Sequence, residues 1–215
     1  MSDAMSAARD MSSFFWLCPP LGRAYSISGL GEHSLTDIDR YARGLEVPSR
    51  PVVLRWRRGR KQPADAIWLG VSNLAISPRL IDLLTPFTGW STYPVEVYDG
   101  WGARAPGYVG LVIVGRCGRM LHDLERVEQE TDWNWLNYVG LHFSLESWDG
   151  SDIFYPSLGA GPIVSLRLRD ALRRARVTNI LLEQLSEART EKRMVDDMRV
   201  KHVGPYADVD PPAHR

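Results

Sequence analysis

Short apolar runs separated by turn-forming residues cover most of the chain, and their spacing predicts its secondary structure. Runs rich in β-branched and aromatic residues predict strands at 14–17, 52–56, 66–71, 108–114 and 138–145. Apolar residues at helical spacing predict a helix at 34–45, with Ser34 as its N-cap, and another within 118–132. Strands and helices interleave irregularly and no Gly-rich turn follows the first strand. The pattern therefore predicts an α+β fold with a mixed, largely antiparallel sheet rather than a Rossmann arrangement.

One phrase, Ser-x-Arg-Leu-x-Asp-x-Leu, occurs twice in the chain. Its copies begin at Ser77 and Ser165, an offset of 165 − 77 = 88 residues. Each copy follows one apolar run and precedes another, which predicts two strand-helix-strand repeats at about 66–98 and 152–185. Both serines are placed to act as N-caps, accepting a hydrogen bond from the first turn of the helix that follows.

The charged residues of the phrase predict ion pairs within each helix. Arg79 stands three residues before Asp82, and Arg167 three residues before Asp170. Such pairs lie on the solvent side of a helix and contribute only about 0.2–0.5 kcal/mol each. The phrase therefore indicates a scaffold more than a reactive site.

The same residues carry a resemblance to a known family. The first phrase is followed by Pro-Val-Glu-Val at 94–97, and the second is preceded by Asp-Ile-Phe at 152–154. With these flanks the chain resembles, from about 66 to 185, the bacterial immunity proteins of polymorphic toxin systems, long catalogued as a domain of unknown function. The resemblance implies a non-enzymatic protein that binds and neutralises a toxin made by its own cell or its kin. It offers no catalytic motif and so implies no catalytic residue.

Composition indicates where the protein is expected to reside and which classes of partner are disfavoured. Basic and acidic residues are balanced at 26 each, which disfavours a globally basic nucleic-acid binder. Two cysteines, Cys18 and Cys117, cannot form a disulfide framework, and no Cys/His spacing predicts a metal site. The apolar run at 14–18 is too short for a signal sequence or a membrane span. We therefore expect a cytoplasmic protein that uses no cofactor and no membrane.

The chain is long enough to bury a sizeable core in one domain. We expect a single α+β domain at 13–203, because 44% of the residues are hydrophobic. The polar segment 1–12 and the proline-containing segment 204–215 are expected to be flexible tails.

Acidic residues beside tryptophans are the first candidates for a partner surface. One segment contains Glu128, Glu130, Asp132, Trp133 and Trp135, and a second contains Trp148 and Asp149. An acidic rim around aromatic anchors suits a partner with a basic cleft, such as the active site of a nuclease toxin. The alternative is that the three tryptophans are core residues beside ordinary loops.

Two basic features are weaker candidates for a partner surface. Arg169, Arg173 and Arg176 are spaced i, i+4, i+7, which predicts a basic stripe opposite the apolar face of the second helix. The alternative is a solvated outer face. The basic run at 55–61 could hold phosphate, but as a hairpin turn between two strands it would equally guard a sheet edge.

Candidates for catalysis are few. Cys117 follows Arg116, whose charge could lower the thiol pKa, and His122 and His142 are available as bases, but no motif joins them. A buried structural thiol is the alternative, so the residues predict no enzyme activity. The leading hypothesis is an immunity protein that blocks a cognate toxin by stoichiometric binding. The alternatives are a small cysteine- or histidine-dependent hydrolase or transferase, and a nucleic-acid-binding module that uses the basic hairpin.

Overall fold

The computed structural model of the chain describes residues 11–20, 33–55, 64–69, 73–99, 101–122, 127–130, 135–157 and 161–193. For the strand residues 127–130, 135–137 and 190–193 it describes the backbone only. The predicted tails therefore lie outside the described residues, apart from positions 11 and 12.

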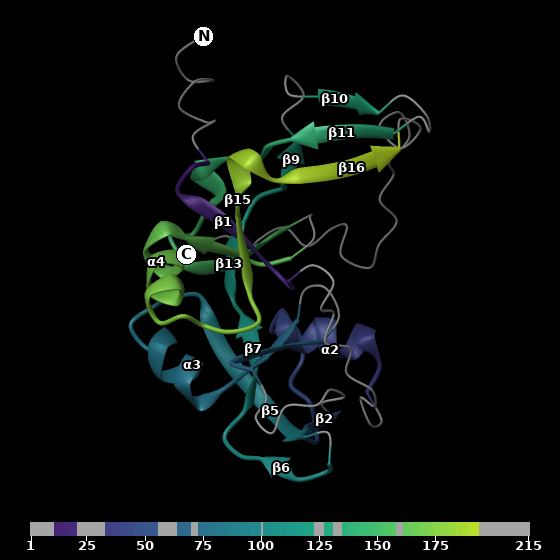
Figure 1. Cartoon of the computed structure of the whole chain (residues 1–215), viewed down its shortest axis with the longest axis vertical. Coiled ribbons are helices and arrows are strands. Elements are labelled where there is room, and N and C mark those ends of the chain that lie inside the picture. The colour runs from purple at the N-terminus through teal and green to yellow at the C-terminus, as the bar shows by residue number, and fades with distance from the viewer. Residues whose placement is uncertain are drawn as a thin grey trace.

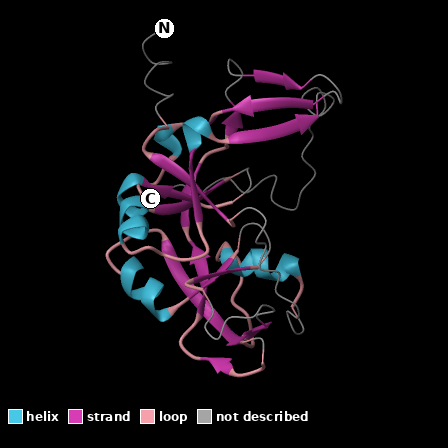
Figure 2. Ribbon diagram, viewed as in Figure 1, coloured by secondary structure: helices cyan, strands magenta, loops and turns pink. Residues whose placement is uncertain are grey.

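The prediction of an α+β fold is confirmed. The described residues contain three α-helices, namely α2 (Leu35–Ala42), α3 (Pro78–Leu84) and α4 (Leu166–Arg174), together with mixed, largely antiparallel sheets. Figures 1 and 2 show two large sheets, one above the other in this view, with α3 and α4 on the same side of the molecule.

The lower sheet in Figure 1 is six-stranded. Its main path runs in the order β2 (Val52–Arg55), β5 (Trp90–Tyr98), β7 (Val109–Ile113), β4 (Leu74–Ile76) and β3 (Ala66–Trp68), and β6 (Arg104–Ala105) also pairs with β5. The pairing of β2 with β5 is parallel, whereas the other pairings are antiparallel.

The upper large sheet is five-stranded. It runs in the order β15 (Leu181–Gln184), β1 (Phe14–Cys18), β14 (Ile163–Ser165), β13 (Ile153–Pro156) and β8 (Gly115–Cys117). The pairing of β13 with β8 is parallel and the remaining pairings are antiparallel.

Two small sheets and two short 3-10 helices complete the fold. The smaller elements are β9 (Leu121–His122), β10 (Val127–Glu130), β11 (Trp135–Val139), β12 (Leu141–His142), β16 (Arg189–Arg193), η1 (Leu145–Ser147) and η2 (Leu185–Glu187). β11 lies between β10 and β16, and β9 pairs with β12. In Figure 1 this part lies at the top of the molecule, beyond β1 and β15.

The two large sheets share one arrangement of strands. In the lower sheet the chain runs β3, β4, α3, β5, and β7 lies between β4 and β5, antiparallel to both. In the upper sheet it runs β13, β14, α4, β15, and β1 lies between β14 and β15, antiparallel to both. The middle strand of the lower sheet, β7, thus comes after both of its neighbours in the sequence. The middle strand of the upper sheet, β1, comes before both of its neighbours.

The helices begin where the sequence predicts. Ser77 and Ser165 are N-caps whose hydroxyls accept from the amides of Leu80 and Leu168, at 3.3 and 3.4 Å. Ser34 caps α2 and shares a capping box with Asp37. In each case the cap satisfies an amide that has no partner within the helix.

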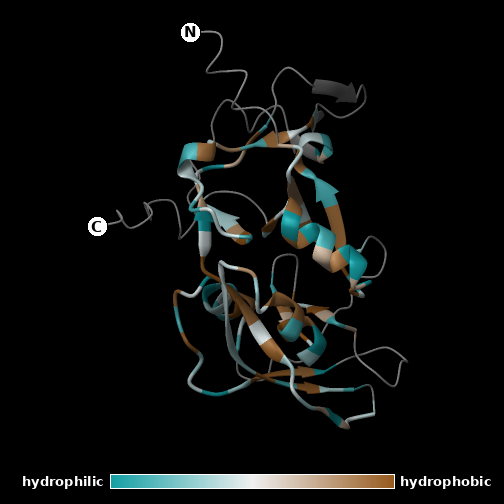
Figure 3. Ribbon diagram, turned by 90° about the vertical axis from the view of Figure 1, so that its left-hand side faces the viewer, coloured by the Kyte–Doolittle hydropathy of each residue, from teal (hydrophilic) through white to brown (hydrophobic). Residues whose placement is uncertain are grey.

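The main core lies between the two large sheets and the helices α3 and α4. Leucines on one face of each helix meet apolar residues of the strands, and the contributors from the helices are Leu80, Leu84, Leu168 and Leu172. A second cluster lies beneath α2 and contains Ile38, Val52 and Tyr93. Figure 3 shows the helices banded in teal and brown and many strands in brown, as expected for amphipathic helices on buried strands.

Two predictions about local structure are wrong. The helix predicted within 118–132 is absent from the described residues, because β9 and β10 pair with the strands that follow. Met120 packs against the cluster containing Phe14 and Phe143, so tertiary pairing overrides its helical spacing.

The basic run at 55–61 is also not the turn of a hairpin. β2 pairs with β5 and β3 pairs with β4, so β2 and β3 lie at opposite edges of the six-stranded sheet. Val52 and Leu54 of β2 are buried in the cluster beneath α2. This burial favours pairing of β2 with β5 over pairing with β3, the next strand in the sequence.

Candidate functional site

The repeated phrase builds two polar clusters of the same composition. The Asp65 cluster consists of Asp65, Ser77, Arg79 and Thr178, and the Asp152 cluster consists of Asp152, Ser165, Arg167 and Thr88. In each, the aspartate directly precedes the first strand of a hairpin and the serine caps the helix after the second strand.

In the Asp65 cluster the carboxylate accepts hydrogen bonds from three side chains. Arg79 Nε and Nη2 lie 3.0 and 2.6 Å from its two oxygens, and Ser77 Oγ lies at 3.1 Å. The amide and hydroxyl of Thr178 donate at 2.8 and 2.9 Å. Burial raises the pKa of Asp65, but the hydrogen bonds from Arg79 and Thr178 outweigh it and hold the pKa at about 2. This carboxylate is therefore ionised and fully engaged, which makes it a poor general base.

The Asp152 cluster repeats this geometry. Arg167 Nε and Nη2 lie 3.0 and 2.5 Å from the two carboxylate oxygens of Asp152, and Ser165 Oγ donates at 2.9 Å. The amide and hydroxyl of Thr88 donate at 3.0 and 3.2 Å. Burial again raises the pKa of Asp152, and the hydrogen bonds, led by those from Arg167, lower it below its usual value.

Each cluster takes its threonine from the other half of the fold. Thr178 follows α4 but binds the aspartate before β3, and Thr88 follows α3 but binds the aspartate before β13. The arginines cross in the same way, because Arg79 donates to the carbonyl of residue 175 at 2.8 Å and Arg167 to that of residue 86 at 3.3 Å. The clusters therefore brace the two sheets against each other.

The predicted ion pairs within the helices are wrong. Arg79 and Arg167 bind Asp65 and Asp152 instead of Asp82 and Asp170. The side chains of Asp65 and Asp152 are only 12% and 9% exposed, so bidentate pairing there is less screened than pairing on the helix surface.

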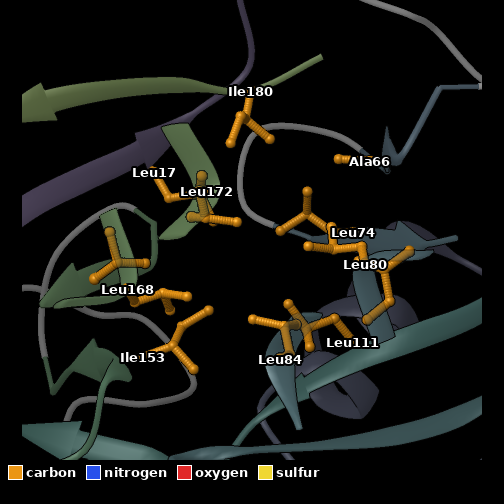
Figure 4. Close-up of a pocket in the computed structure, with 12 residues that line it drawn as sticks. Leu17, Ala66, Leu74, Leu80, Leu84, Leu111, Ile153, Leu168, Leu172 and Ile180 are labelled. Carbon is orange, nitrogen blue, oxygen red and sulfur yellow. The ribbon is translucent and has the colours of Figure 1, made fainter. Parts of the chain in front are cut away.

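The apolar pocket between α3 and α4 is too small to hold a ligand. Figure 4 shows leucine and isoleucine side chains from both sheets and both helices pointing into it. Its volume is about 20 Å³, whereas ligand sites measure about 300–1,000 Å³. A void of this size holds about one water, and apolar walls give such a water no partners. It is a packing gap in the core.

The predicted acidic and aromatic segment falls on β10 and β11. Glu128 and Glu130 lie in β10 and Trp135 in β11, and Glu130 is opposite Trp135 in the register. Asp132 and Trp133 lie outside the described residues.

Trp148 and Asp149 hold a turn in place. The Trp148 ring meets the ring of Phe14 edge-on at 5.0 Å, and its indole nitrogen donates to the carbonyl of Ser151 at 3.0 Å. Asp149 accepts from the amides of Arg116 and Ser151 at 2.8 and 3.0 Å. These contacts match the alternative interpretation of Trp148, that of a residue packed against the core.

The prediction that Arg169, Arg173 and Arg176 form one basic stripe along the helix is wrong. α4 ends at Arg174, so Arg176 lies beyond it, with a positive φ of 50°. Arg169 lies with its guanidinium 4.3 Å from the ring centroid of Phe15 and pairs with Asp170 at 3.0 Å. Arg173 and Arg176 are exposed.

The two cysteines are poorly suited to nucleophilic chemistry. Burial, with a smaller contribution from Asp149, raises the pKa of Cys117 to about 12. Burial and Glu183 raise the pKa of Cys18 to a similar value. At pH 7 such a thiol is ionised in only about one molecule in 10⁵, which leaves almost no nucleophile.

The basic run is described only at its first residue, since 56–63 lie outside the described residues. Arg55 has its guanidinium 5.5 Å from the ring centroid of Tyr98.

Among the residues whose side chains the structure describes, the most exposed aromatic one is Trp101, in the turn between β5 and β6. Its side chain is 67% exposed. The turn is fixed by Asp99, whose carboxylate accepts from the amides of Trp101 and Ala103 at 2.9 and 2.8 Å. The amide of Asp99 also donates to the carbonyl of Ala103 at 2.8 Å, and Gly102 adopts a φ of +85°, which favours glycine. The described residues of this turn thus place a large aromatic residue in solvent.

A surface cleft of about 570 Å³ lies beside this turn. One wall comes from the start of α3 and the other from the segment after Trp101, and the polar lining residues are Asp65, Ser77, Arg79, Asp99, Arg104 and Tyr108. Pro78 packs so closely on Gly107 that a Cβ at position 107 would lie 2.6 Å from its Cγ. Tyr108 donates to the carbonyl of Ala64 at 2.9 Å. These contacts give the cleft an ordered base.

The sequence reasoning missed Trp101 and Arg104 as site residues. A signal was present, because Asp99, glycine at 100 and 102, and a tryptophan between them form a turn sequence that carries an aromatic residue. The cleft itself had no sequence signal, since its walls come from segments that meet only in the fold.

Comparisons with known proteins give no family for the chain, because no family model matches it and no curated protein matches it. Within the described ranges no group of three or more His, Cys, Asp and Glu side chains could hold a metal ion. None of the helices in the same ranges combines the length and the apolar character that crossing a bilayer requires.

Proposed function

We propose that this chain is an immunity protein, which neutralises a cognate toxin by stoichiometric binding. The observation that carries the proposal is Trp101, an aromatic side chain that is 67% exposed on a turn fixed by hydrogen bonds. Tryptophan is enriched among the residues that dominate binding energy at interfaces. The amides of Trp101 and Ala103 are already bound by Asp99 in the free protein, so ordering them on binding costs little entropy.

The state of the reactive groups favours binding over catalysis. The carboxylates of Asp65 and Asp152 are engaged in the two clusters, and the thiols of Cys18 and Cys117 have pKa values of about 12. These groups stabilise the fold, which counts against the alternative of a cysteine-dependent hydrolase or transferase.

The choice of a toxin as the partner rests on the sequence resemblance. The residues that carry it include Asp152, Ser165 and Arg167, which form one of the clusters. We propose that a phrase with this role marks an architecture shared with that family, for which the resemblance implies no catalytic motif.

The predicted surface residues keep a place in the proposal. Asp149, Arg173 and Arg176 are exposed, and Glu128, Glu130 and Trp135 lie on the adjacent strands β10 and β11. We propose that these residues make secondary contacts, whereas Trp148 is packed against Phe14.

The test is co-expression with the toxin domain encoded beside this gene. We expect the chain to restore growth and to form a 1:1 complex with that domain in size-exclusion chromatography with light scattering. Cys117→Ser should protect equally well, because binding needs no thiolate. Protection at far below one chain per toxin, abolished in a folded Cys117→Ser variant, would instead establish an enzyme. Failure of every neighbouring toxin to bind would refute the proposal.

A further inference from the structure

We propose that three arginines at the end of α4 form a docking surface for an acidic region of the toxin. These α4-end arginines are Arg173 and Arg174, in the last turn of the helix, and Arg176, in the turn that follows. The inference rests on the proposed function. It goes further by naming a surface and the charge of the toxin region that binds there.

The α4-end arginines are free to meet a partner. All three side chains are exposed, and none of them has an ion pair with another described residue. Arg174 Nε donates to the carbonyl of Asp170 in its own helix at 3.3 Å, which leaves its other donors unused by any described hydrogen bond. Each guanidinium therefore offers N–H donors in the planar fork that matches a carboxylate.

The surface remains positive when the acidic neighbours are counted. The nearby carboxylates are taken by other arginines, in the pairs Asp170 with Arg169, Asp152 with Arg167 and Asp65 with Arg79. Asp82 of α3 is also exposed, and counting it in full against the three arginines leaves 3 − 1 = 2 positive charges. The negative end of the α4 dipole is equivalent to about half a charge and does not cancel them.

The corresponding end of α3 carries no such charges, although α3 and α4 have the same place in their two sheets. The residues 88 positions before the α4-end arginines are Thr85, Pro86 and Thr88. The last turn of α3 has no basic residue. The architecture thus forms the end of this helix without arginines, so their presence on α4 favours a role in binding over a role in folding.

The backbone beneath the α4-end arginines is fixed by hydrogen bonds. The amides of Ala175 and Arg176 donate to the carbonyls of Ala171 and Arg173, both at 3.0 Å. Arg79 Nη1 and Nη2 donate to the carbonyls of Ala175 and Arg176 at 2.8 and 3.4 Å. Binding would therefore order the arginine side chains but not the backbone that carries them, which lowers the entropy cost.

Arg79 also connects this surface with the turn that carries Trp101. Its guanidinium contacts the end of α4, and its side chain lines the surface cleft together with Asp99 and Ala103 of that turn. In Figure 1, α3 accordingly lies between α4 and β6. An interface centred on Trp101 would have the α4-end arginines in its polar rim, where charges mainly set the rate of association.

An acidic protein surface suits this group better than a nucleic acid does. Basic and acidic residues are balanced at 26 each over the whole chain, so no general positive field draws the protein to a polyanion. Proteins that bind nucleic acid through its backbone commonly neutralise about 6–10 phosphates. Three arginines are few for that task, but they are sufficient to pair with carboxylates at the rim of a protein interface.

The experiment measures binding of the purified, catalytically inactive toxin domain encoded beside this gene by biolayer interferometry at low and at high salt. Arg173→Glu and Arg176→Glu should each slow association at least about fivefold at low salt, with a smaller difference at high salt because ions screen exposed charges. Arg173→Lys keeps the charge and should associate within about twofold of the wild type.

Arg40→Glu is the matched control. Arg40 is likewise an arginine in the last turn of a helix, and its side chain is 44% exposed, but it belongs to α2, which Figure 1 shows away from α4. The substitution changes the net charge as much as Arg173→Glu does, so association within about twofold of the wild type would exclude an effect of net charge alone. Circular dichroism and urea unfolding should show all four variants folded.

The outcomes separate the two proposals. If the wild type binds at 1:1 while Arg173→Glu and Arg176→Glu associate within twofold of it, the docking surface is wrong and the immunity function stands. If the wild type does not bind, both proposals fail. If Arg173→Lys loses as much as Arg173→Glu, or if Arg173→Glu associates faster than the wild type, the toxin region is not recognised by its negative charge and the inference is overturned.

A nucleic-acid partner is tested in parallel by fluorescence anisotropy with a labelled duplex oligonucleotide. We expect no binding at the concentrations at which the toxin binds. Binding that is lost in Arg173→Glu, with toxin association unchanged in the same variant, would assign the α4-end arginines to nucleic acid and overturn the inference.

Discussion

Replacing Asp152 with alanine tests whether the two polar clusters brace the fold. The substitution removes the acceptor for Thr88, Ser165 and Arg167 at once. A donor left unsatisfied in a buried position costs about 1–3 kcal/mol. Ser165 is buried, whereas Arg167 is 61% exposed and can return to water, so its loss adds about 1 kcal/mol at most. We expect Asp152→Ala to lower the free energy of unfolding by about 2–4 kcal/mol.

The assay is urea unfolding followed by tryptophan fluorescence and by circular dichroism. Asp170→Ala is the matched control, because Asp170 has a 51% exposed side chain and its ion pair among the described residues is with the neighbouring Arg169. It should change the free energy of unfolding by less than about 1 kcal/mol. A double-mutant cycle of Asp152→Ala with Thr88→Ala should show a coupling of at least about 0.5 kcal/mol across the two halves. A loss of less than about 1 kcal/mol in Asp152→Ala, together with zero coupling, would refute the role of the cluster.

Three further predictions concern acid stability, packing and thiol chemistry. The pKa of Asp65 is about 2 in the folded protein, below its ordinary value of 3.8, so its contribution to stability should be lost as the pH falls from about 4 to about 2. Asp65→Asn should therefore flatten that part of the pH-stability curve measured by thermal unfolding, and an unchanged slope would contradict the assignment. A Cβ at Gly110 would lie 2.1 Å from the buried ring of Tyr93, so Gly110→Ala should destabilise the fold by about 1–3 kcal/mol in urea, and a neutral effect would mean that the ring moves freely. Cys117, with a pKa of about 12, should react with a disulfide reagent at least about 100-fold more slowly in the native protein than in urea, and equal rates would show that the thiol is not protected.

Local signals in the sequence were sufficient to predict the elements whose determinants lie close together in the chain. The capped helices are examples, since Ser77 and Ser165 each stand directly before the helix that they cap. The charged partners of Arg79 and Arg167 were not predictable in this way. Each arginine has an aspartate three residues later in the sequence. In the fold it binds instead a largely buried aspartate 14 or 15 residues earlier, whose carboxylate also accepts from a threonine of a distant segment.

The same limit explains the errors in the strands and in the candidate site. The spacing around Met120 is compatible with a helix, and only pairing with later strands decides against it. Trp148 and Trp101 both stand next to turn-forming residues in the sequence. Trp148 nevertheless packs on Phe14, whereas Trp101 remains in solvent. Which tryptophan has an apolar neighbour depends on the tertiary fold, which the residues next to it do not reveal.

The position of β1 imposes an order of events during synthesis. β1 is translated before its partner β14, and Phe15 is paired with Val164, 164 − 15 = 149 residues later. At about 5–20 residues per second, that partner follows after roughly 7–30 s. During this interval the chain between β3 and β7 can already pair within the lower sheet, while neither partner strand of β1 has been made. β14 and β15 thus complete a sheet with a strand translated long before them, and the nascent chain must keep β1 from pairing elsewhere until they arrive.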